Sequence, residues 1–354
     1  MNLYFMETAV LIDRILIVGL GSIGKRHLRL ARQILPTADI RILRHHPGSE
    51  VPESANGVFF RMEEAIDFAP QIAVIANPAP FHVATAQALA SAGAHLLVEK
   101  PLSDSLTGVA QLLETCRQQR VGLLTGYNLR YVTSLERFRN LLSERIVGRV
   151  LSVRCEVGQF LPDWRADSDY RHSVSAQRKL GGGALLELSH ELDYLRWIFG
   201  EVEWVHAILS RQSTLELDVE DSAHLSLGFI STSDTPPLIA TANLDFIRHD
   251  TTRLCTAIGE SGSLRWNGVT GCVELYQAGA KQWEELFRHP QQRDDSYLAQ
   301  WNHLIDCVQQ HRTPLISGED GLRVLEIIEA ARSSASTGKT VSIASIRQAD
   351  RSQT

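Results

Sequence analysis

Three glycines, Gly19, Gly21 and Gly24, have the GxGxxG spacing that can hold the phosphates of a dinucleotide. The pattern follows an apolar run, residues 14–19, that predicts a buried strand, and it opens a segment with helical spacing, residues 24–35. The first glycine permits a tight turn, the second lets backbone approach a pyrophosphate, and the third lets helix and strand pack closely. A glycine turn without a ligand is the alternative, which this context disfavours. The cofactor-binding residues expected here are Gly19, Gly21, Ser22, Ile23 and Gly24.

The end of the next predicted strand, residues 39–43, bears on which dinucleotide binds. An acidic residue at that end would bind the ribose hydroxyls of NAD, but Asp39 begins the strand, at the wrong end of the sheet. The strand is followed instead by Arg44, His45 and His46. A cation at this position suits the extra phosphate of NADP, so the sequence favours NADP over NAD. The alternative is that these basic side chains are simply solvated.

Two further buried strands end in short motifs at the edge of the sheet where ligands bind. Ala76-Asn77-Pro78 forms a rigid turn that could line the nicotinamide side of the cleft, or could be a plain strand-to-helix turn. Lys100 sits between Glu99 and Pro101, after the apolar run HLLV. Its ammonium could donate a proton or a hydrogen bond to a substrate oxygen; a surface lysine is the alternative. The cofactor-binding residues expected from these motifs are Asn77, Pro78, His82, Glu99 and Lys100.

His190 lies in a segment, residues 181–199, that opens with three glycines and is predicted to form one helix. Asp193 and Glu187 are each three residues from it, so on a helix either carboxylate could orient the imidazole. An imidazole that titrates near neutral pH can accept the proton of a substrate hydroxyl. A histidine on an amphipathic helix is more often a capped or core residue, but the glycine run favours close approach of a ligand. The catalytic candidates are Lys100, His190 and Asp193.

The polar stretch before this helix, residues 164–179, contains several cations, and polar loops on a scaffold frequently carry binding groups. We expect some of these cations to hold an anionic part of the substrate, a carboxylate or a phosphate. A solvated loop is the equal alternative. The cations of this stretch are Arg165, Arg171, Arg178 and Lys179. The substrate-binding candidates are Arg130, Tyr131, Trp164, Arg165, Arg171, Glu187 and His190.

Strands and helices alternate from residue 14 to about residue 125, which implies a parallel sheet with helices on both faces. Between residues 202 and 276 strands follow one another without helices, which suggests an antiparallel sheet. Closing helices are expected at residues 297–310 and 320–337. We therefore predict an α/β chain with a Rossmann dinucleotide-binding domain, residues 9–125, and an α/β substrate domain, residues 126–346.

The composition excludes several other classes of protein. A net charge of −6 over 354 residues argues against nucleic-acid binding through general basic charge. The five cysteines contain no CxxC pair, so neither a zinc site nor a disulfide framework is indicated. No apolar run approaches the roughly 20 residues that span a bilayer, and the first 13 residues do not read as a signal peptide. We expect a cytoplasmic protein with a small-molecule substrate.

Four motifs in order carry a resemblance to a known family: GLGSIGKRH (19–27), ANPAPFH (76–82), EKP (99–101) and GGGALLELSHELDYLRW (181–197). Together they resemble the Gfo/Idh/MocA oxidoreductases, named for glucose-fructose oxidoreductase and inositol dehydrogenase. Two late stretches, residues 257–267 and 319–341, are similar to the family as well. The likeness runs from about residue 13 to residue 342.

The resemblance implies a Rossmann domain followed by an α+β domain with a large, mostly antiparallel open sheet, which often forms a dimer or tetramer interface. It implies hydride transfer between the nicotinamide and a hydroxyl or keto carbon of a sugar or sugar derivative. The family's lysine falls on Lys100 and its histidine on His190; Asp193 also matches. Many members carry an aspartate where this chain has Leu186, so the family triad does not transfer fully.

Further short motifs, including FLPDWR (160–165) and LSHELDYL (188–195), resemble those of a subgroup from bacterial surface-sugar pathways, which suggests an anionic or nucleotide-linked substrate. Two alternatives keep the same fold. One is a reductase of a non-sugar carbonyl or diol. The other is a non-catalytic NAD(P)-binding sensor, which would not need both Lys100 and His190.

Overall fold

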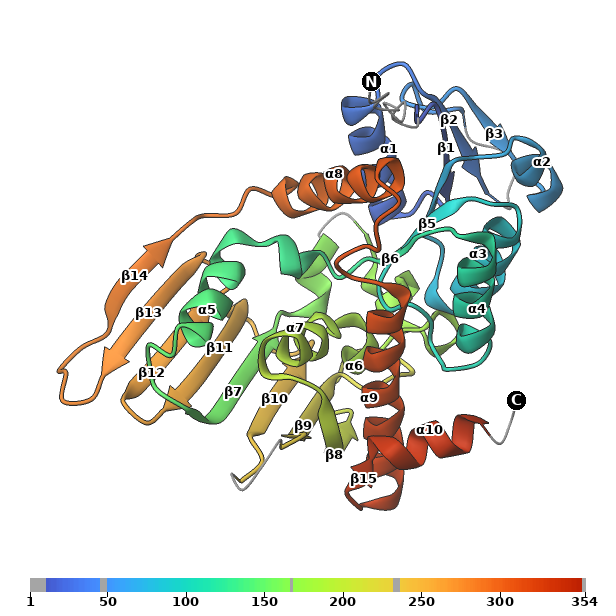
Figure 1. The fold of residues 1–354 in the computed structure, drawn as a ribbon. Coiled ribbons are helices and arrows are strands. Elements are labelled where there is room, and N and C mark those ends of the chain that lie inside the picture. Colours follow the sequence, from blue (N-terminus) through green and yellow to red (C-terminus); the bar gives the residue numbers. More distant parts are fainter. Residues whose placement is uncertain (1–10, 45–49, 166–167, 232–235, 352–354) are drawn as a thin grey trace, which may run out of the picture. The chain divides into compact units, whose positions relative to one another are not determined.

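The structure is a computed structural model in which the chain forms two compact units (Figure 1). It describes residues 11–44, 50–165, 168–231 and 236–351. The first unit comprises the described part of residues 1–102, Gly108–Gly126 and Tyr297–Glu319. The second unit comprises Ser103–Thr107, Tyr127–Ser296 and the described chain from Asp320 onward. Each unit is built around one β-sheet.

The sheet of the first unit has six parallel strands in the order β3-β2-β1-β4-β5-β6. They are β1 (Arg14–Val18), β2 (Asp39–Leu43), β3 (Gly57–Phe59), β4 (Ile72–Ile75), β5 (His95–Val98) and β6 (Leu123–Thr125). All of β4 and all but the first residue of β1 are buried, which explains their uninterrupted apolar sequences. The strand order reverses between β1 and β4, and such switch points are where open parallel sheets bind ligands. The Rossmann prediction is confirmed.

The helices of the first unit pack on this sheet and include one that returns from far along the chain. They are α1 (Ser22–Ile34), α2 (Met62–Asp67), the short 3₁₀ helix η1 (Ala79–Phe81), α3 (His82–Ser91), α4 (Val109–Gln119) and, from Tyr297, α8 (Asp295–Gln309). Trp301, Leu304 and Val308 of α8 are buried in one core with Ile15 of β1 and Ile40 of β2. The alternation of strands and helices does not predict this return, because it depends on packing between distant segments.

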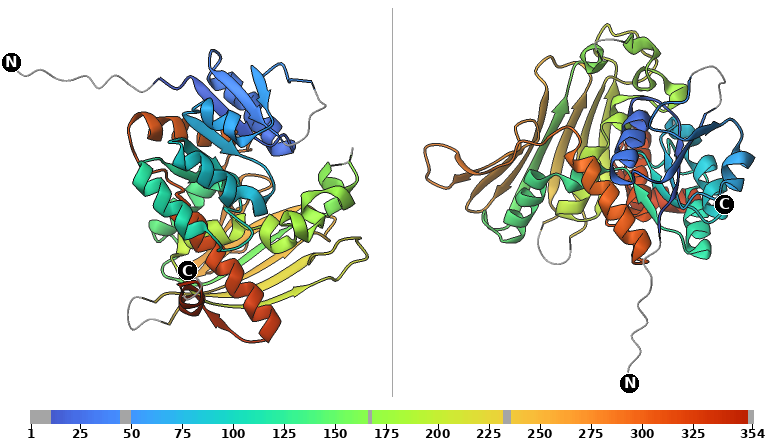
Figure 2. Two further views of the ribbon diagram at one scale, coloured as in Figure 1. Left: turned by 90° about the vertical axis from the view of Figure 1, so that its right-hand side faces the viewer. Right: turned by 90° about the horizontal axis from the view of Figure 1, so that it is seen from above.

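The sheet of the second unit has nine strands in the order β14-β13-β12-β11-β7-β10-β9-β8-β15. They are β7 (Val150–Gly158), β8 (Val202–Ser210), β9 (Ser222–Phe229), β10 (Ile239–Asp245), β11 (Thr252–Gly259), β12 (Gly262–Asn267), β13 (Cys272–Gln277), β14 (Glu284–Arg288) and β15 (Val341–Ser342). Only the β7–β10 pair is parallel, so the predicted mostly antiparallel sheet is confirmed. Figure 2 shows its strands side by side as one broad layer.

Helices cover one face of this sheet. The helices of the second unit are α5 (Thr133–Ser143), α6 (Ala184–Glu187), α7 (His190–Phe199), α9 (Gly318–Thr337, from Asp320) and α10 (Ile343–Arg351). Trp266 of β12 donates its indole N–H to Ser134 of α5 and packs edge-on against Tyr194 of α7, so α5 and α7 share that face. None of the helices in the described part of the chain is long and apolar enough to cross a membrane.

The prediction of one helix over residues 181–199 is wrong, because the structure has two. Gly181 and Gly183 adopt positive φ angles of 79° and 110°, so they precede the helix rather than join it. The first helix, α6, ends at Glu187, and α7 begins at His190 with a backbone hydrogen bond from Asp193 to Ser189. The buried Tyr127 hydroxyl donates to the Ser189 hydroxyl at the break. Contacts distant in sequence therefore decide where the helix is interrupted.

Irregular chain before α6 forms a series of short 3₁₀ turns rather than an open loop. These turns are η3 (Leu161–Arg165), η4 (Tyr170–His172), η5 (Val174–Ala176) and η6 (Arg178–Leu180). A fifth, η2 (Asn128–Tyr131), follows β6 at the start of the second unit. The turns position most of the side chains predicted to bind substrate.

Candidate active site

The glycine turn between β1 and α1 has the geometry that phosphate binding needs. Gly19 has φ of 87°, and a Cβ there would lie 2.9 Å from the Ala76 carbonyl oxygen. A Cβ on Gly24 would overlap the carbonyl oxygen of Gly19. At Gly21, by contrast, no described atom lies within 4 Å of the Cβ position, and this residue is the N-cap of α1 without a side-chain cap among the described residues. The turn is therefore closed on the protein side and open beside the helix N-terminus, where phosphate groups bind.

Substitutions of Gly21 and Gly24 are expected to have contrasting effects. We expect Gly21→Val to fold normally, because its side chain meets open space, but to raise the Kd for NAD(P)H at least about tenfold by blocking the pyrophosphate. Gly24→Ala should instead lower the free energy of unfolding, since its methyl group overlaps backbone. Fluorescence titration and urea unfolding of both variants measure these effects. Unchanged cofactor affinity in Gly21→Val would contradict the assignment of the turn.

The carboxyl end of β2 carries the cation expected to select the cofactor. Arg44 is half-buried, and its guanidinium lies 5.8 Å from the centre of the Phe60 ring. Asp39, at the opposite end of β2, is bound by Arg41 through two hydrogen bonds of 2.6 and 2.9 Å. The rejection of Asp39 as a ribose ligand agrees with this placement. His45 lies outside the described residues.

A buried histidine joins the two motifs that follow β4 and β5. The two ring nitrogens of His82 lie 2.7 Å from the Asn77 carbonyl oxygen and 3.0 Å from the Pro101 carbonyl oxygen. The Asn77 amide donates to Thr85, whereas its Oδ1 has no hydrogen-bond partner among the described residues. Asn77 follows β4 at the sheet edge, so this acceptor suits a group such as a carboxamide of the cofactor. The Lys100–Pro101 peptide bond is cis.

Burial lowers the pKa of His82 below its ordinary value. The unfolded chain therefore takes up a proton at this residue at higher pH than the native protein does. We expect the neutral imidazole to make its full contribution to the free energy of unfolding above about pH 6.5. On further acidification the free energy of unfolding should fall by up to about 1.4 kcal/mol per pH unit for each such histidine.

In His82→Asn the dependence of unfolding free energy on pH should be shallower between about pH 6.5 and 5. Some dependence remains, because burial also lowers the pKa of His95 and of His303. Urea unfolding at several pH values measures the slope. An identical slope in wild type and variant would contradict the prediction.

Glu99 and Lys100 follow β5 at the same edge of the sheet. Glu99 is 7% exposed, and its carboxylate lies 2.7 Å from the buried His27 imidazole and accepts a hydrogen bond from the Lys100 backbone N–H at 3.2 Å. Lys100 itself is half-buried. The glycine turn, Asn77, Glu99 and Lys100 are thus all placed by the carboxyl ends of neighbouring strands of one sheet.

In the second unit, His190 is the first residue of α7. It is half-buried and packs edge-on against the ring of the buried Tyr127, with ring centres 5.6 Å apart. Glu187 lies on the separate helix α6, where it accepts a hydrogen bond from Ser175. The prediction that Glu187 and His190 share one helix face is therefore wrong, because α6 ends at Glu187 and a separate helix begins at His190.

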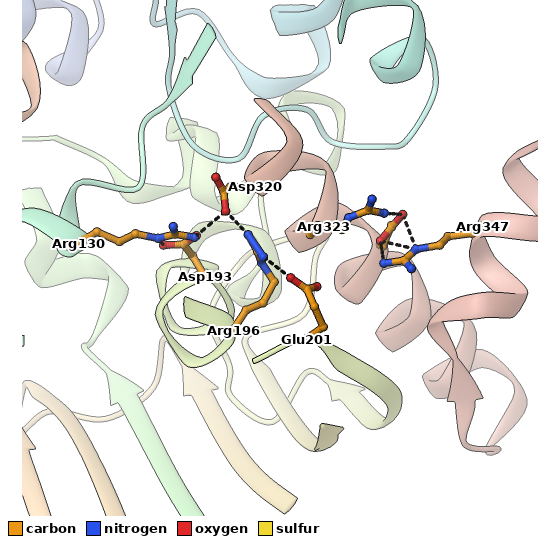
Figure 3. Close-up of polar contacts among 8 residues, drawn as sticks. Arg130, Asp193, Arg196, Glu201, Asp320, Arg323 and Arg347 are labelled. Carbon is orange, nitrogen blue, oxygen red and sulfur yellow. Dashed lines mark hydrogen bonds and ion pairs between the residues drawn. The ribbon is translucent and has the colours of Figure 1, made fainter. Parts of the chain in front are cut away.

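Asp193, three residues after His190, takes part in a buried charge network (Figure 3). Both of its carboxylate oxygens accept hydrogen bonds from Arg130, at 2.9 and 2.6 Å, and the two side chains are only 1% and 3% exposed. Arg130 also contacts Asp320 of α9 at 3.2 Å, and Asp320 contacts Arg196 of α7. Arg130, a substrate-binding candidate from the sequence, is thus bound by carboxylates of the protein itself. Tyr131, the next residue, is half-buried at the end of η2.

Two cations of the 3₁₀ turns are bound by other groups of the protein. Arg171 pairs with Asp169 at 2.8 Å and with Glu216 at 3.2 Å, and its hydrogen bonds lower the pKa of Asp169 to about 2. Arg178 donates to the Asp218 backbone carbonyl. The side chain of Arg165 lies outside the described part of the structure. This pairing weakens the expectation that Arg171 and Arg178 bind a substrate anion.

A small hollow lies among the same turns. Trp164 donates its indole N–H to the Gln159 carbonyl and packs edge-on against Phe246. The hollow is lined by Leu161, Trp164, Ser168, Tyr170, Ser173 and Ser175. It is small, with room for about one water molecule. Trp164 is a substrate-binding candidate from the sequence, and its role stays a prediction.

The described residues hold no cluster of three or more His, Cys, Asp or Glu side chains suited to a metal ion. All five cysteines are free and buried.

Comparison with known proteins identifies both units. Residues 14–127 match the family model described as an oxidoreductase family with an NAD-binding Rossmann fold, and residues 139–343 match the C-terminal alpha/beta domain of the same family. The chain is 31% identical over 235 residues to an uncharacterized oxidoreductase of Synechocystis, covering 62% of this chain but only 59% of that protein. It is 25% identical over 342 residues to the myo-inositol 2-dehydrogenase of Thermotoga maritima, covering 93% and 98% of the two chains.

A solved structure extends the likeness in fold. The WlbA dehydrogenase from Bordetella pertussis, in complex with NADH and UDP-GlcNAcA, superposes with a TM-score of 0.75 at 21% identity, covering 93% of this chain and 98% of that one. Two successive family models together cover most of the chain. The chain belongs to the Gfo/Idh/MocA family of oxidoreductases, with the family's NAD-binding Rossmann domain and C-terminal α/β domain.

Proposed function

We propose that this protein transfers a hydride between NAD(P) and a CH–OH or keto carbon of a sugar or sugar derivative. The observation that carries the proposal is the edge of the Rossmann sheet, where the open glycine turn follows β1 and Lys100 follows β5, with β4 between these two strands. The bound nicotinamide supplies the hydride acceptor or donor. The protein has to supply position, charge and a route for one proton.

Lys100 and His190 have the chemistry for these tasks. In oxidation, the ammonium of Lys100 donates a hydrogen bond to the reacting oxygen, and the imidazole of His190 accepts the hydroxyl proton as the hydride leaves the same carbon. In reduction, His190 returns the proton to the oxygen. Asp193 contributes to positioning through its helix, α7, rather than by direct contact with substrate, since Arg130 binds both of its oxygens.

The finer substrate class is an anionic or nucleotide-linked sugar, with a neutral sugar or polyol as the competitor. The UDP-GlcNAcA in the WlbA structure and the FLPDWR motif, residues 160–165, support the anionic or nucleotide-linked sugar. The inositol dehydrogenase relative and the ion pairs of Arg171 support the neutral sugar or polyol. Arg171→Ala should raise KM only for an anionic substrate, so comparing KM for a sugar acid and its neutral counterpart separates the two.

For the cofactor, NADP remains our proposal, supported by Arg44 at the carboxyl end of β2. Arg44→Ala should raise the KM for NADP(H) and leave that for NAD(H) nearly unchanged, because only NADP carries the extra phosphate. We further propose a dimer or tetramer through the C-terminal sheet, where Leu151, Ile208 and Ile239 leave apolar surface exposed. Light scattering of the purified protein measures its mass in solution.

Cofactor turnover with a panel of sugars, sugar acids, nucleotide sugars and polyols tests the main proposal. Oxidation or reduction of at least one sugar by NADP(H) or NAD(H) is the expected result. Tight cofactor binding without turnover of any sugar would contradict it and favour a sensor. Activity restricted to diols or non-sugar carbonyl compounds would contradict the substrate class alone.

A further inference from the structure

Lys100 lies between two residues that are each held by a buried histidine. Pro101, on one side, contacts His82 through its carbonyl oxygen, and Glu99, on the other, contacts His27 through its carboxylate. We propose that His27 and Trp301 are positioning residues for this turn. In this proposal, a hydrogen-bonded chain from the indole through a neutral imidazole fixes the Glu99 carboxylate beside Lys100. The inference rests on the proposed function of Lys100.

The first link fixes the protonation of the imidazole. The indole Nε1 of Trp301 lies 3.0 Å from Nδ1 of His27, and both side chains are fully buried. Because an indole N–H can only donate, Nδ1 must be the acceptor and carries no proton. His27 is therefore neutral, with its single proton on Nε2. The rings of Tyr297 and Trp301 pack edge-on against the imidazole, at 5.9 and 6.0 Å, which restricts its rotation.

The second link fixes the carboxylate. With its proton on Nε2, His27 donates to Oε1 of Glu99 at 2.7 Å, and Oε2 accepts from the backbone N–H of Lys100 at 3.2 Å. Glu99 is the acceptor in both contacts, and an ionised carboxylate can only accept hydrogen bonds. The backbone of Gly126 closes over the group, because a Cβ there would be only 3.0 Å from Oε2. Glu99 thus has little freedom to move away from Lys100.

The chain of contacts joins three segments that are remote in sequence. His27 lies on α1, three residues after Gly24 of the phosphate-binding turn, Glu99 ends β5, and Trp301 belongs to the returning helix α8. Helix α8 therefore does more than complete the core of the first unit. It holds the cofactor-binding helix and the lysine turn in one hydrogen-bonded arrangement.

His82 provides a useful contrast within the same turn. Both of its ring nitrogens lie near carbonyl oxygens, so no donor in these two contacts selects a tautomer. In His27 one nitrogen meets a donor and the other an acceptor, which matches a single neutral tautomer. A specific protonation state is therefore built in at His27, by Trp301.

Nitrogen-15 NMR of the histidine-labelled protein tests the first link without any substitution. The His27 resonances, assigned by their absence in His27→Asn, should report a neutral ring with an unprotonated Nδ1 and a protonated Nε2. A protonated Nδ1, or a doubly protonated ring at neutral pH, would overturn the proposal. This measurement needs no substrate, so it stands even if no sugar is turned over.

Trp301→Phe tests the positioning role, because it keeps an aromatic ring and removes only the indole donor. We expect the single His27 tautomer to be lost and kcat to fall about three- to tenfold, the effect of one hydrogen bond. The KM for cofactor should stay within about twofold, since the phosphates bind at the start of α1. Glu99→Gln, which retains shape and loses charge, should lower kcat by at least as much.

Trp266→Phe is the matched control, because it also removes one buried indole hydrogen bond, to Ser134 in the second unit. It should leave the His27 tautomer and kcat unchanged. Equal kcat and equal His27 resonances in Trp301→Phe and Trp266→Phe would overturn the positioning role. Failure of the sugar panel with the expected tautomer present would overturn the proposed function and leave the hydrogen-bonded chain intact.

Discussion

Lys100→Met is expected to lower kcat by about 10²- to 10⁴-fold, the range in which a positioned proton donor contributes to catalysis. Methionine keeps most of the length of the side chain but has no proton to donate to the substrate oxygen. Cofactor affinity should change little, because Lys100 is proposed to act on the substrate. Steady-state kinetics with the best substrate of the panel, together with titration of NAD(P)H, measures both quantities.

His190→Asn should produce a loss of similar size, and the double variant should be scarcely worse than either single one, since groups that act as a unit are not additive. Lys281→Met, an exposed lysine near the β13–β14 turn, serves as a control for loss of charge. A kcat of Lys100→Met equal to that of the control would contradict the assigned role. Losses that multiply in the double variant would indicate two independent functions.

Arg130→Ala is expected to lower the free energy of unfolding by about 3–5 kcal/mol, the usual cost of removing one partner of a buried ion pair. It leaves the carboxylate of Asp193, only 1% exposed, without either of its two hydrogen bonds from Arg130. Burial already raises the pKa of Asp193, so in the variant this carboxyl should take up a proton far more readily. Urea unfolding of the variant and wild type gives the difference.

Arg171→Ala is the matched control for Arg130→Ala. Arg171 also pairs with two carboxylates, but its side chain is 50% exposed and water screens the pairs. We expect its unfolding free energy to stay close to that of wild type. Equal stability of both variants would contradict the view that the Arg130 network holds η2, α7 and α9 together.

Most elements of the first unit could be predicted closely because their cause is local, although the sequence pattern did not predict the short strand β3. Strand β4 is buried throughout, so its sequence is an uninterrupted apolar run, and β2 begins and ends at the predicted residues, Asp39 and Leu43. The glycine spacing was equally informative, since Gly19 and Gly24 are required by close backbone contacts. Such features depend on neighbours in the chain and are visible in the sequence.

The remaining features depend on partners far apart in the chain. The break between α6 and α7 is set beside Ser189, which contacts Tyr127, 62 residues away. Arg130 reads as a cleft residue until its partners Asp193 and Asp320, 63 and 190 residues away, are known. Trp301 joins the cofactor-binding unit through a contact across 274 residues. No local period or motif encodes contacts of this kind.

The central claim is that Lys100 and His190 act on one substrate oxygen beside the nicotinamide. A crystal structure with NAD(P)H and a substrate found in the panel measures this directly. The account predicts Lys100 Nζ and a ring nitrogen of His190 each within about 3.2 Å of the reacting oxygen, with its carbon against the nicotinamide C4. A complex in which either side chain points away from that oxygen would contradict it.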